Sequence, residues 1–270
     1  MAQLDRRSVA LRAQELIEDD IHEARDQVRP CNEAGHGFTD FAYPFDNPIF
    51  YIKFGNRSIA SMTAEARTHQ FSFDALENTP LERRNDIRIP QICRILYTPR
   101  GAYIVMEYVQ GKTLGQLYQK IERFEENSKP YYDKIARGIK LPLSIPVPTD
   151  AKPGPCGGGI IKHPLFKDGE ALIRYDSIGN LATWFIKTNP KVTLERKLAY
   201  TLISTKETFM FIDAGDLYIL DFEHVAFLPI SFQDFAFRSP FMMSSLVAPR
   251  IQDQFDLPQN NFMVTERFLD

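Results

Sequence analysis

The sequence contains few cysteines and no long apolar run. Its three cysteines, Cys31, Cys93 and Cys156, are widely separated among 270 residues. An odd, scattered set is atypical of a disulfide-rich secreted protein and indicates reduced thiols inside a cell. No apolar run approaches the roughly 18 residues of a membrane-spanning helix, and the first twenty residues lack the apolar core of a secretory signal. These absences predict a cytoplasmic protein that does not bind membranes.

An excess of basic charge is also missing. The chain has 32 Lys and Arg against 35 Asp and Glu, which gives a net charge of −3. Nucleic-acid-binding proteins usually carry a basic patch or stripe, so we expect no nucleic-acid partner. The remaining composition, 44% hydrophobic and 25% charged residues, is that of a globular protein with a substantial core.

Glycine is scarcer than proline, with 14 residues against 18. Several prolines lie between Pro142 and Pro155, just before the triplet Gly157–Gly159. This stretch predicts an irregular segment. The triplet does not follow a strand that leads directly into a helix, as a phosphate-binding loop would, so we expect a flexible connection there.

Hydrophobic periodicity predicts a two-part α+β protein. It indicates helices over residues 8–28, 58–75, 113–126 and 177–188, and strands over 48–55, 92–97, 103–109 and within 198–222. Strands dominate before residue 110, and helices with loops dominate after it. We therefore expect an N-terminal helix and aromatic loop region (1–47), a small antiparallel-sheet N-lobe (48–110) and a larger, mainly helical C-lobe (111–270).

Lys53 lies inside an apolar β-type run, Pro48–Gly55. A lysine in such a run either faces water from an edge strand or has a function there. Glu65 follows twelve residues later, near the start of a predicted helix. A strand lysine paired with a helix glutamate holds the α- and β-phosphates of the nucleotide in protein kinases. Lys53 and Glu65 are therefore candidate nucleotide-binding residues.

Two further segments carry candidate site residues. The backbone around Glu107–Val109, at the end of an apolar strand, is suited to present N–H and C=O groups to an adenine ring. Asp221 follows another apolar strand directly, at the position where kinase folds place the carboxylate that binds Mg²⁺.

Taken in order, these segments resemble the aminoglycoside-phosphotransferase and choline-kinase branch of the protein-kinase-like superfamily, especially its small fungal members. The similar stretches are Tyr51–Gly55, Thr63–Ala66, Tyr103–Gly111, Pro153–Gly159, Tyr175–Ile178 and Leu220–Pro229. The resemblance implies a two-lobed kinase-like fold with ATP and Mg²⁺ as cofactors. It also implies Glu223, which follows Asp221 at a position acidic in the fungal proteins, as a second candidate metal ligand.

The catalytic loop departs from the family pattern, His-x-Asp-x-x-x-x-Asn. Alignment of this loop on the strand pair that follows it places Thr201 at the histidine, Ile203 at the aspartate and Thr208 at the asparagine. Isoleucine has no group that could take a proton from a substrate hydroxyl. Glu207 is a weak candidate for a displaced base, although a structural role on the solvent side is favoured for it. The catalytic residue is therefore unidentified.

Three functions are compatible with this pattern. The favoured one is a weak or inactive kinase that binds nucleotide or another small ligand in the interlobe cleft. The second is an active ATP-dependent phosphotransferase with a displaced base, acting on a small hydroxylated molecule. The third is a repurposed, non-phosphorylating enzyme of specialised metabolism.

Overall fold

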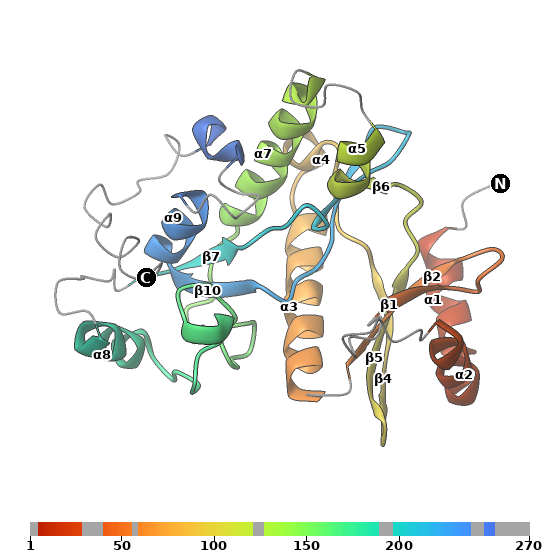
Figure 1. Ribbon diagram of the computed structural model, residues 1–270, viewed down its shortest axis with the longest axis horizontal. Helices are drawn as coiled ribbons and strands as arrows, with labels where there is room; N and C mark the ends of the chain where they lie inside the picture. The colour runs from red at the N-terminus through yellow and green to blue at the C-terminus, as the bar shows by residue number, and fades with distance from the viewer. Residues whose placement is uncertain are drawn as a thin grey trace. The chain divides into compact units, whose positions relative to one another are not determined.

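The computed structural model describes residues 5–28, 40–55, 59–120, 127–188, 197–238 and 246–251. The chain divides into two compact units. The first comprises Met1–Ala66 and Pro90–Gln110, and the second comprises Arg67–Ile89 and Gly111–Asp270. The first unit is built on an antiparallel sheet, and helix exceeds strand in the second (Figure 1). The predicted α+β class is confirmed. Residues 67–89, which the predicted N-lobe included, group with the second unit.

The first unit is a four-stranded antiparallel sheet with helices on both faces. Its elements are α1 (Arg6–Gln14), α2 (Glu18–Val28), β1 (Asp40–Tyr43), β2 (Phe50–Gly55), the first turns of α3 (Ile59–Glu77), β4 (Ile92–Thr98) and β5 (Gly101–Glu107). The strand order is β1-β2-β5-β4. β2 is therefore an interior strand. Strands are confirmed within the predicted ranges 48–55, 92–97 and 103–109, and a helix within 58–75.

Alternation along β2 sends its side chains to two different layers. Phe50, Ile52 and Phe54 are buried in a cluster with residues of α1 and α2, which lie on one side of the sheet (Figure 1). Tyr51 packs on the other face, in a cluster that contains Met62 of α3. Because successive strand residues point to opposite faces, Lys53 shares the α3 face with Tyr51.

The single helix predicted over residues 8–28 is wrong. The structure has two helices, α1 and α2, separated by residues 15–17. Arg94 of β4 explains the break, because its Nη1 lies within 3.1 Å of the carbonyl oxygens of Ala13, Gln14 and Leu16. The carbonyl groups that end a helix need such partners, and this one comes from a strand about 80 residues later.

The second unit contains short strands among its helices. The helices are α4 (Leu81–Arg84), α5 (Leu114–Lys120), α7 (Lys129–Leu143), α8 (Ile178–Thr188) and α9 (Ile230–Arg238), with 3-10 turns at Lys167–Gly169 and Ala248–Arg250. The strands are β3 (Ile87–Arg88), β6 (Lys112–Thr113), β7 (Leu198–Leu202), β8 (Phe209–Phe211), β9 (Leu217–Ile219) and β10 (Val225–Pro229). They form one sheet of order β3-β9-β8-β6 and an antiparallel pair of β10 and β7.

The predictions for this unit are confirmed in part. Strands lie within 198–222 and a helix within 177–188 as expected. The helix expected over 113–126 begins at Leu114, and residues 121–126 lie outside the described part of the chain. α7 was not predicted, because Pro130 and Pro142 obscured the spacing of Ile135 and Ile139. Pro130 lies in the first turn, where proline is tolerated, and Pro142 lies at the last turn.

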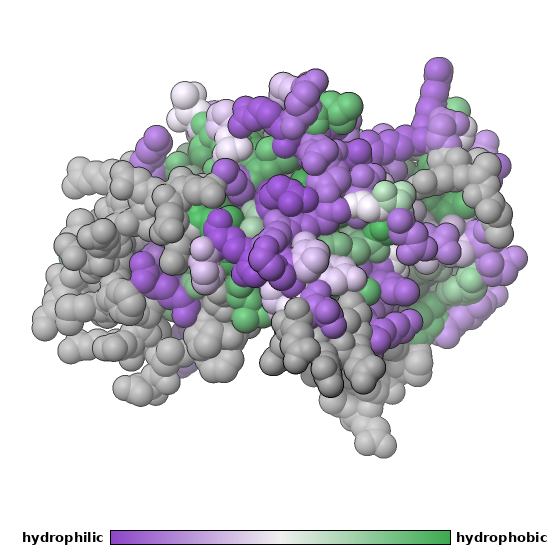
Figure 2. All heavy atoms as spheres, turned by 90° about the horizontal axis from the view of Figure 1, so that it is seen from above, coloured by the Kyte–Doolittle hydropathy of each residue, from purple (hydrophilic) through white to green (hydrophobic). Residues whose placement is uncertain are grey.

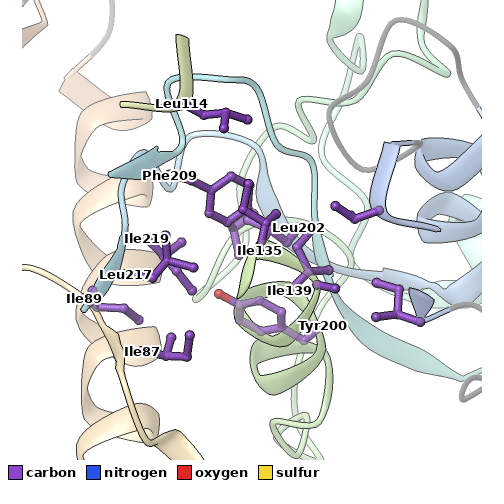
Figure 3. Close-up of a cluster of buried hydrophobic side chains, with 14 of the residues drawn as sticks. Ile87, Ile89, Leu114, Ile135, Ile139, Tyr200, Leu202, Phe209, Leu217 and Ile219 are labelled. Atoms are coloured by element: carbon purple, nitrogen blue, oxygen red, sulfur yellow. The ribbon is translucent and has the colours of Figure 1, made fainter. Parts of the chain in front are cut away.

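A core of aliphatic and aromatic side chains holds the second unit together. Phe209, Leu217 and Ile219 of the β8–β9 hairpin pack against Ile135 and Ile139 of α7 (Figure 3). β10 is buried along its whole length, because Val225 and Phe227 belong to this core and Ala226 and Leu228 to a second one between α8 and α9.

The surface agrees with the mixed composition. On the face shown in Figure 2, hydrophilic side chains predominate among the described residues, and apolar ones form smaller areas between them. None of the described helices is both long and apolar enough to span a membrane.

His163 makes the stability of the second unit dependent on pH. The imidazole is fully buried; its Nδ1 accepts a hydrogen bond from the Leu165 N–H at 3.0 Å, and its Nε2 lies 3.2 Å from the Phe232 carbonyl oxygen. Burial lowers the pKa of His163 from 6.5 to about 3. Below pH 6.5 the unfolded chain therefore binds a proton that the folded chain does not bind. As a result, the free energy of unfolding decreases by about 1.4 kcal/mol for each unit by which the pH is lowered.

We expect His163→Gln to remove that slope between pH 6.5 and 4.5, although the variant is less stable at pH 7.5. Urea unfolding at several pH values measures both quantities. An unchanged pH slope in the variant would show that His163 is not the titrating group.

Candidate functional site

Lys53 and Glu65 form an ion pair on the α3 face of the sheet. Lys53 Nζ lies 2.6 Å from Glu65 Oε1, and the two side chains are only 18% and 9% exposed. Since β2 is an interior strand, the alternative of an edge-strand lysine facing water does not hold. Removing charges from water costs free energy that the pair recovers only through good geometry.

The position of Glu65 follows from the packing of α3. Met62, Glu65 and Ala66 lie at helical spacing i, i+3 and i+4, so they share one helix face. Met62 and Ala66 pack against Ile104 and Met106 of β5 in the cluster on this face of the sheet. The apolar contacts of the first turns of α3 therefore position Glu65 next to Lys53 of β2.

The end of β5 leaves one backbone donor unused. The N–H of Glu107 donates to the Gln91 carbonyl oxygen and that of Tyr108 to the Ile49 carbonyl oxygen, each at 3.0 Å. Val109 is buried, and its N–H has no hydrogen-bond partner among the described residues. Because buried N–H groups are nearly always paired, this group fits a ligand acceptor such as an adenine nitrogen.

The side chain of Glu107 has a partner that sequence analysis missed. Arg6 of α1 binds it through two atoms, with Nε 3.2 Å from Oε2 and Nη2 3.2 Å from Oε1. Such a bidentate fork is a strong, charge-assisted geometry between an arginine and a carboxylate. Nothing in the sequence links residues 6 and 107, which are 101 positions apart, so no local signal could have revealed the contact.

Asp221 lies in the second unit, in a constrained backbone conformation just after β9. Its φ is 61°, in the left-handed region that residues other than glycine rarely adopt. The residues on either side fix this conformation: the Leu220 N–H donates to the Thr208 carbonyl oxygen at 2.7 Å, and the buried Phe222 ring packs 4.5 Å from the His69 ring. Such strain persists only where the surroundings enforce it, and it is common at functional sites.

Among the described residues, no group of three His, Cys, Asp or Glu could hold a metal. Mg²⁺ typically uses one or two protein carboxylates together with waters and substrate phosphates, and Asp221 fits that role. The Glu223 carboxylate is paired with Lys162, so Glu223 could bind a metal only if this pair opened.

The region of the expected catalytic loop is filled with buried groups. Ile203 is 5% exposed, and Thr201 donates through its hydroxyl to the Ala226 carbonyl oxygen at 2.9 Å. The Thr208 hydroxyl accepts from the Thr205 N–H at 2.9 Å. The Oε1 of Gln233, a fully buried residue that sequence analysis missed, accepts from the Leu202 N–H at 2.8 Å. The only sequence feature that could have indicated Gln233 is its polar amide side chain, which stands among the phenylalanines of α9.

Glu207 is exposed and contacts the start of α5. A Cβ placed on Gly115 would lie only 2.1 Å from Glu207 Oε1, so this glycine makes room for the carboxylate. The contact agrees with the structural role favoured for Glu207. No described carboxylate occupies the base position of the loop, where Ile203 stands.

The structure thus distributes the candidate residues over both units. It brings Lys53 and Glu65 together in the first unit, where Glu107 ends β5 and Val109 lies two residues beyond it. Asp221, Glu223, Ile203 and Glu207 belong to the second unit.

Comparison with known proteins finds similarity to solved structures only. No protein-family model and no curated protein matches the chain. A solved structure described as "Putative fructosamine-3-kinase" from Haemophilus somnus is 13% identical in sequence, with a TM-score of 0.45, over 82% of this chain and 73% of that one.

The pairing of Lys53 with Glu65 predicts a non-additive effect on stability. Lys53→Met leaves the buried Glu65 carboxylate without its cation and should lower the free energy of unfolding by about 3 kcal/mol. The double variant Lys53→Met/Glu65→Leu removes both charges and should be more stable than Lys53→Met alone. Urea unfolding of the four proteins of this double-mutant cycle measures the coupling. Additive losses would contradict a direct interaction between the two side chains.

Proposed function

We propose that this protein is a kinase-like protein of the aminoglycoside-phosphotransferase and choline-kinase type that binds ATP with Mg²⁺ but transfers phosphate weakly or not at all. The observation that carries the proposal is the buried Lys53–Glu65 pair in an interior strand. A water-facing lysine would need neither an interior position nor a buried glutamate.

The pair has a definite role in nucleotide binding. The Glu65 carboxylate orients the Lys53 ammonium and keeps it charged, so that the ammonium can bind α- and β-phosphate oxygens. The N–H of Val109, which has no partner among the described residues, supports adenine binding at the end of β5. Arg6 forms two hydrogen bonds with the Glu107 carboxylate and so stabilises the strand end that precedes the Val109 N–H.

The second unit supports the weak or inactive half of the proposal. Asp221 would hold Mg²⁺, which neutralises phosphate charge when it is bound. At the position of the catalytic base, Ile203 is buried and offers no acceptor for a substrate proton. A positioned base contributes about 10²–10⁴-fold to rate, so a residual rate from binding and positioning alone is compatible with the proposal. In that case, this protein would bind a small hydroxylated molecule of the kind that an active relative phosphorylates, but would phosphorylate it slowly or not at all.

Nucleotide binding is expected to raise the melting temperature and to depend on Lys53. One-site binding at 100 times Kd adds about 2.7 kcal/mol to the free energy of unfolding, which corresponds to a shift of several degrees. We expect this shift for wild type with millimolar Mg-ATP and its loss in Lys53→Met. The readout is the difference in melting temperature between the protein with nucleotide and the protein without it, measured separately for each variant.

Lys134→Met is the matched control. Lys134 also pairs with a carboxylate, Asp86, at 2.6 Å, and its side chain is 17% exposed. It should lose stability but retain the nucleotide-induced shift. Should Lys53→Met not fold, the double variant Lys53→Met/Glu65→Leu, which is expected to be more stable, also lacks the cation and tests the same point. Wild type without any shift, or an equal shift in the Lys53 variants, would refute the proposal.

Asp221 is expected to make nucleotide binding dependent on Mg²⁺. Asp221→Asn keeps the shape of the side chain and tolerates positive φ, but it loses the charge. Its ATP affinity in the presence of Mg²⁺ should fall to the value measured with EDTA. Asp168→Asn is the control, because Asp168 has the same φ of 61° and is exposed. Calorimetric titration of each variant with and without Mg²⁺ gives the comparison. A full Mg²⁺ effect in Asp221→Asn would rule out Asp221 as the metal ligand.

A further inference from the structure

The glycine loop, defined as Pro153–Gly159, has a fixed conformation rather than that of the flexible connection expected from the sequence. Gly154 pairs with Phe227 of β10 through two backbone hydrogen bonds, of 3.1 and 2.8 Å. The Cys156 N–H donates to the hydroxyl of the buried Thr68 on α3 at 2.9 Å. All of these residues belong to the second unit. The loop is thus fastened to a strand and to a helix.

All four glycines of the loop have positive φ, and Gly157 and Gly158 lie in the left-handed region. Gly157 has φ +76° and Gly158 φ +77°, and this left-handed region costs other residues roughly 1 kcal/mol. Gly157 is also exposed to solvent. A Cβ on it would lie 3.2 Å from Cζ of Arg67. The glycine therefore allows the guanidinium group to lie directly against the loop backbone.

Two cationic side chains flank these glycines. Arg67 is exposed; its one hydrogen bond is a weak one of 3.5 Å to the Gly158 carbonyl oxygen, and no described carboxylate pairs with it. Lys152 runs past Gly158, with its Cδ 3.8 Å from the position of a Cβ there. Lys152 pairs with Asp176 at 3.2 Å, but both side chains are more than half exposed, and such surface pairs are weak.

The loop also has unused backbone donors. The Gly158 N–H donates to the Pro155 carbonyl oxygen at 2.8 Å. The N–H groups of Gly157 and of the buried Gly159 have no hydrogen-bond partner among the described residues. Glycine-rich turns with unused N–H groups bind anions, and an arginine fork complements the oxygens of a phosphate.

We propose that the glycine loop, together with Arg67 and Lys152, binds the phosphate group of a small molecule. The two cations match the double negative charge of a phosphate, whereas a carboxylate carries one charge. This site consists of second-unit residues and does not depend on the proposed role of Lys53.

Cys156 provides a reporter within the loop. Burial raises the pKa of its thiol, and the positive charge of Arg67 opposes that rise. A phosphate bound to Arg67 would cancel the opposing charge and lower the thiolate fraction. We expect inorganic phosphate to slow alkylation of Cys156 by iodoacetamide about threefold, which corresponds to about half a pKa unit. Peptide mass spectrometry of the full chain measures each cysteine separately. Cys93 is the internal reference, because burial raises its pKa to about 12.

Chloride and acetate at the same ionic strength distinguish binding from charge screening. Slowing by phosphate alone supports the proposal. Equal slowing by acetate would overturn the assignment to phosphate, and equal slowing by chloride would reveal screening without a site. No effect of phosphate would overturn the proposal altogether.

Two matched pairs of variants locate the effect. Arg67→Met should react more slowly at Cys156 without phosphate and lose the phosphate effect, whereas Arg83→Met, at an exposed arginine of α4, should behave as wild type. Gly157→Ala should lose the effect because its Cβ displaces the guanidinium. Gly169→Ala carries the same backbone strain, at φ +76°, but its Cβ meets no atom within 4 Å, so it should keep the effect. A phosphate effect that survives in both Arg67→Met and Gly157→Ala would place the anion elsewhere.

Discussion

A charged ammonium inside a sheet needs a partner, and this requirement organises the first unit. Lys53 is placed in an interior strand by the pairing of β2 with β1 and β5, and its ammonium is largely removed from water. Glu65 supplies the opposite charge, which requires the first turns of α3 to pack on the same face. The sheet, the helix and the ion pair therefore depend on one another. The other face of the sheet packs a hydrophobic cluster against α1 and α2.

The two units differ in the polar groups at their candidate residues. In the first, Lys53 and Glu65 form a buried ion pair, and the Val109 N–H has no hydrogen-bond partner among the described residues. In the second, Asp221 has a positive φ, whereas the apolar Ile203, at the expected base position, is buried among hydrogen-bonded threonines. This contrast is the reason for proposing nucleotide binding with little phosphotransfer. The glycine loop adds cationic side chains and backbone donors apart from Lys53, Glu65 and Asp221.

Local sequence signals were sufficient where one element forms its own contacts. The β4–β5 hairpin was predicted because two short apolar, β-type runs surround the turn Thr98–Gly101, in which Gly101 has a φ of 142°. α7 was missed because its prolines, one in the first turn and one in the last, resemble breakers when their place in the helix is unknown. The split between α1 and α2 was missed for another reason, since the carbonyl groups at the end of α1 are bound by Arg94 from a distant strand.

The amino-acid order alone determined the α+β class, most strands of the first unit and the identity of the candidate residues, because periodicity and residue chemistry are local properties. Tertiary structure decided what those residues do. It made β2 interior, which turned Lys53 from a possible surface lysine into half of a buried pair. It also joined Arg6 to Glu107 and placed Arg67 and Lys152 beside the glycine loop. Burial and long-range pairing depend on chain segments that meet only after folding, so no window of sequence could have revealed them.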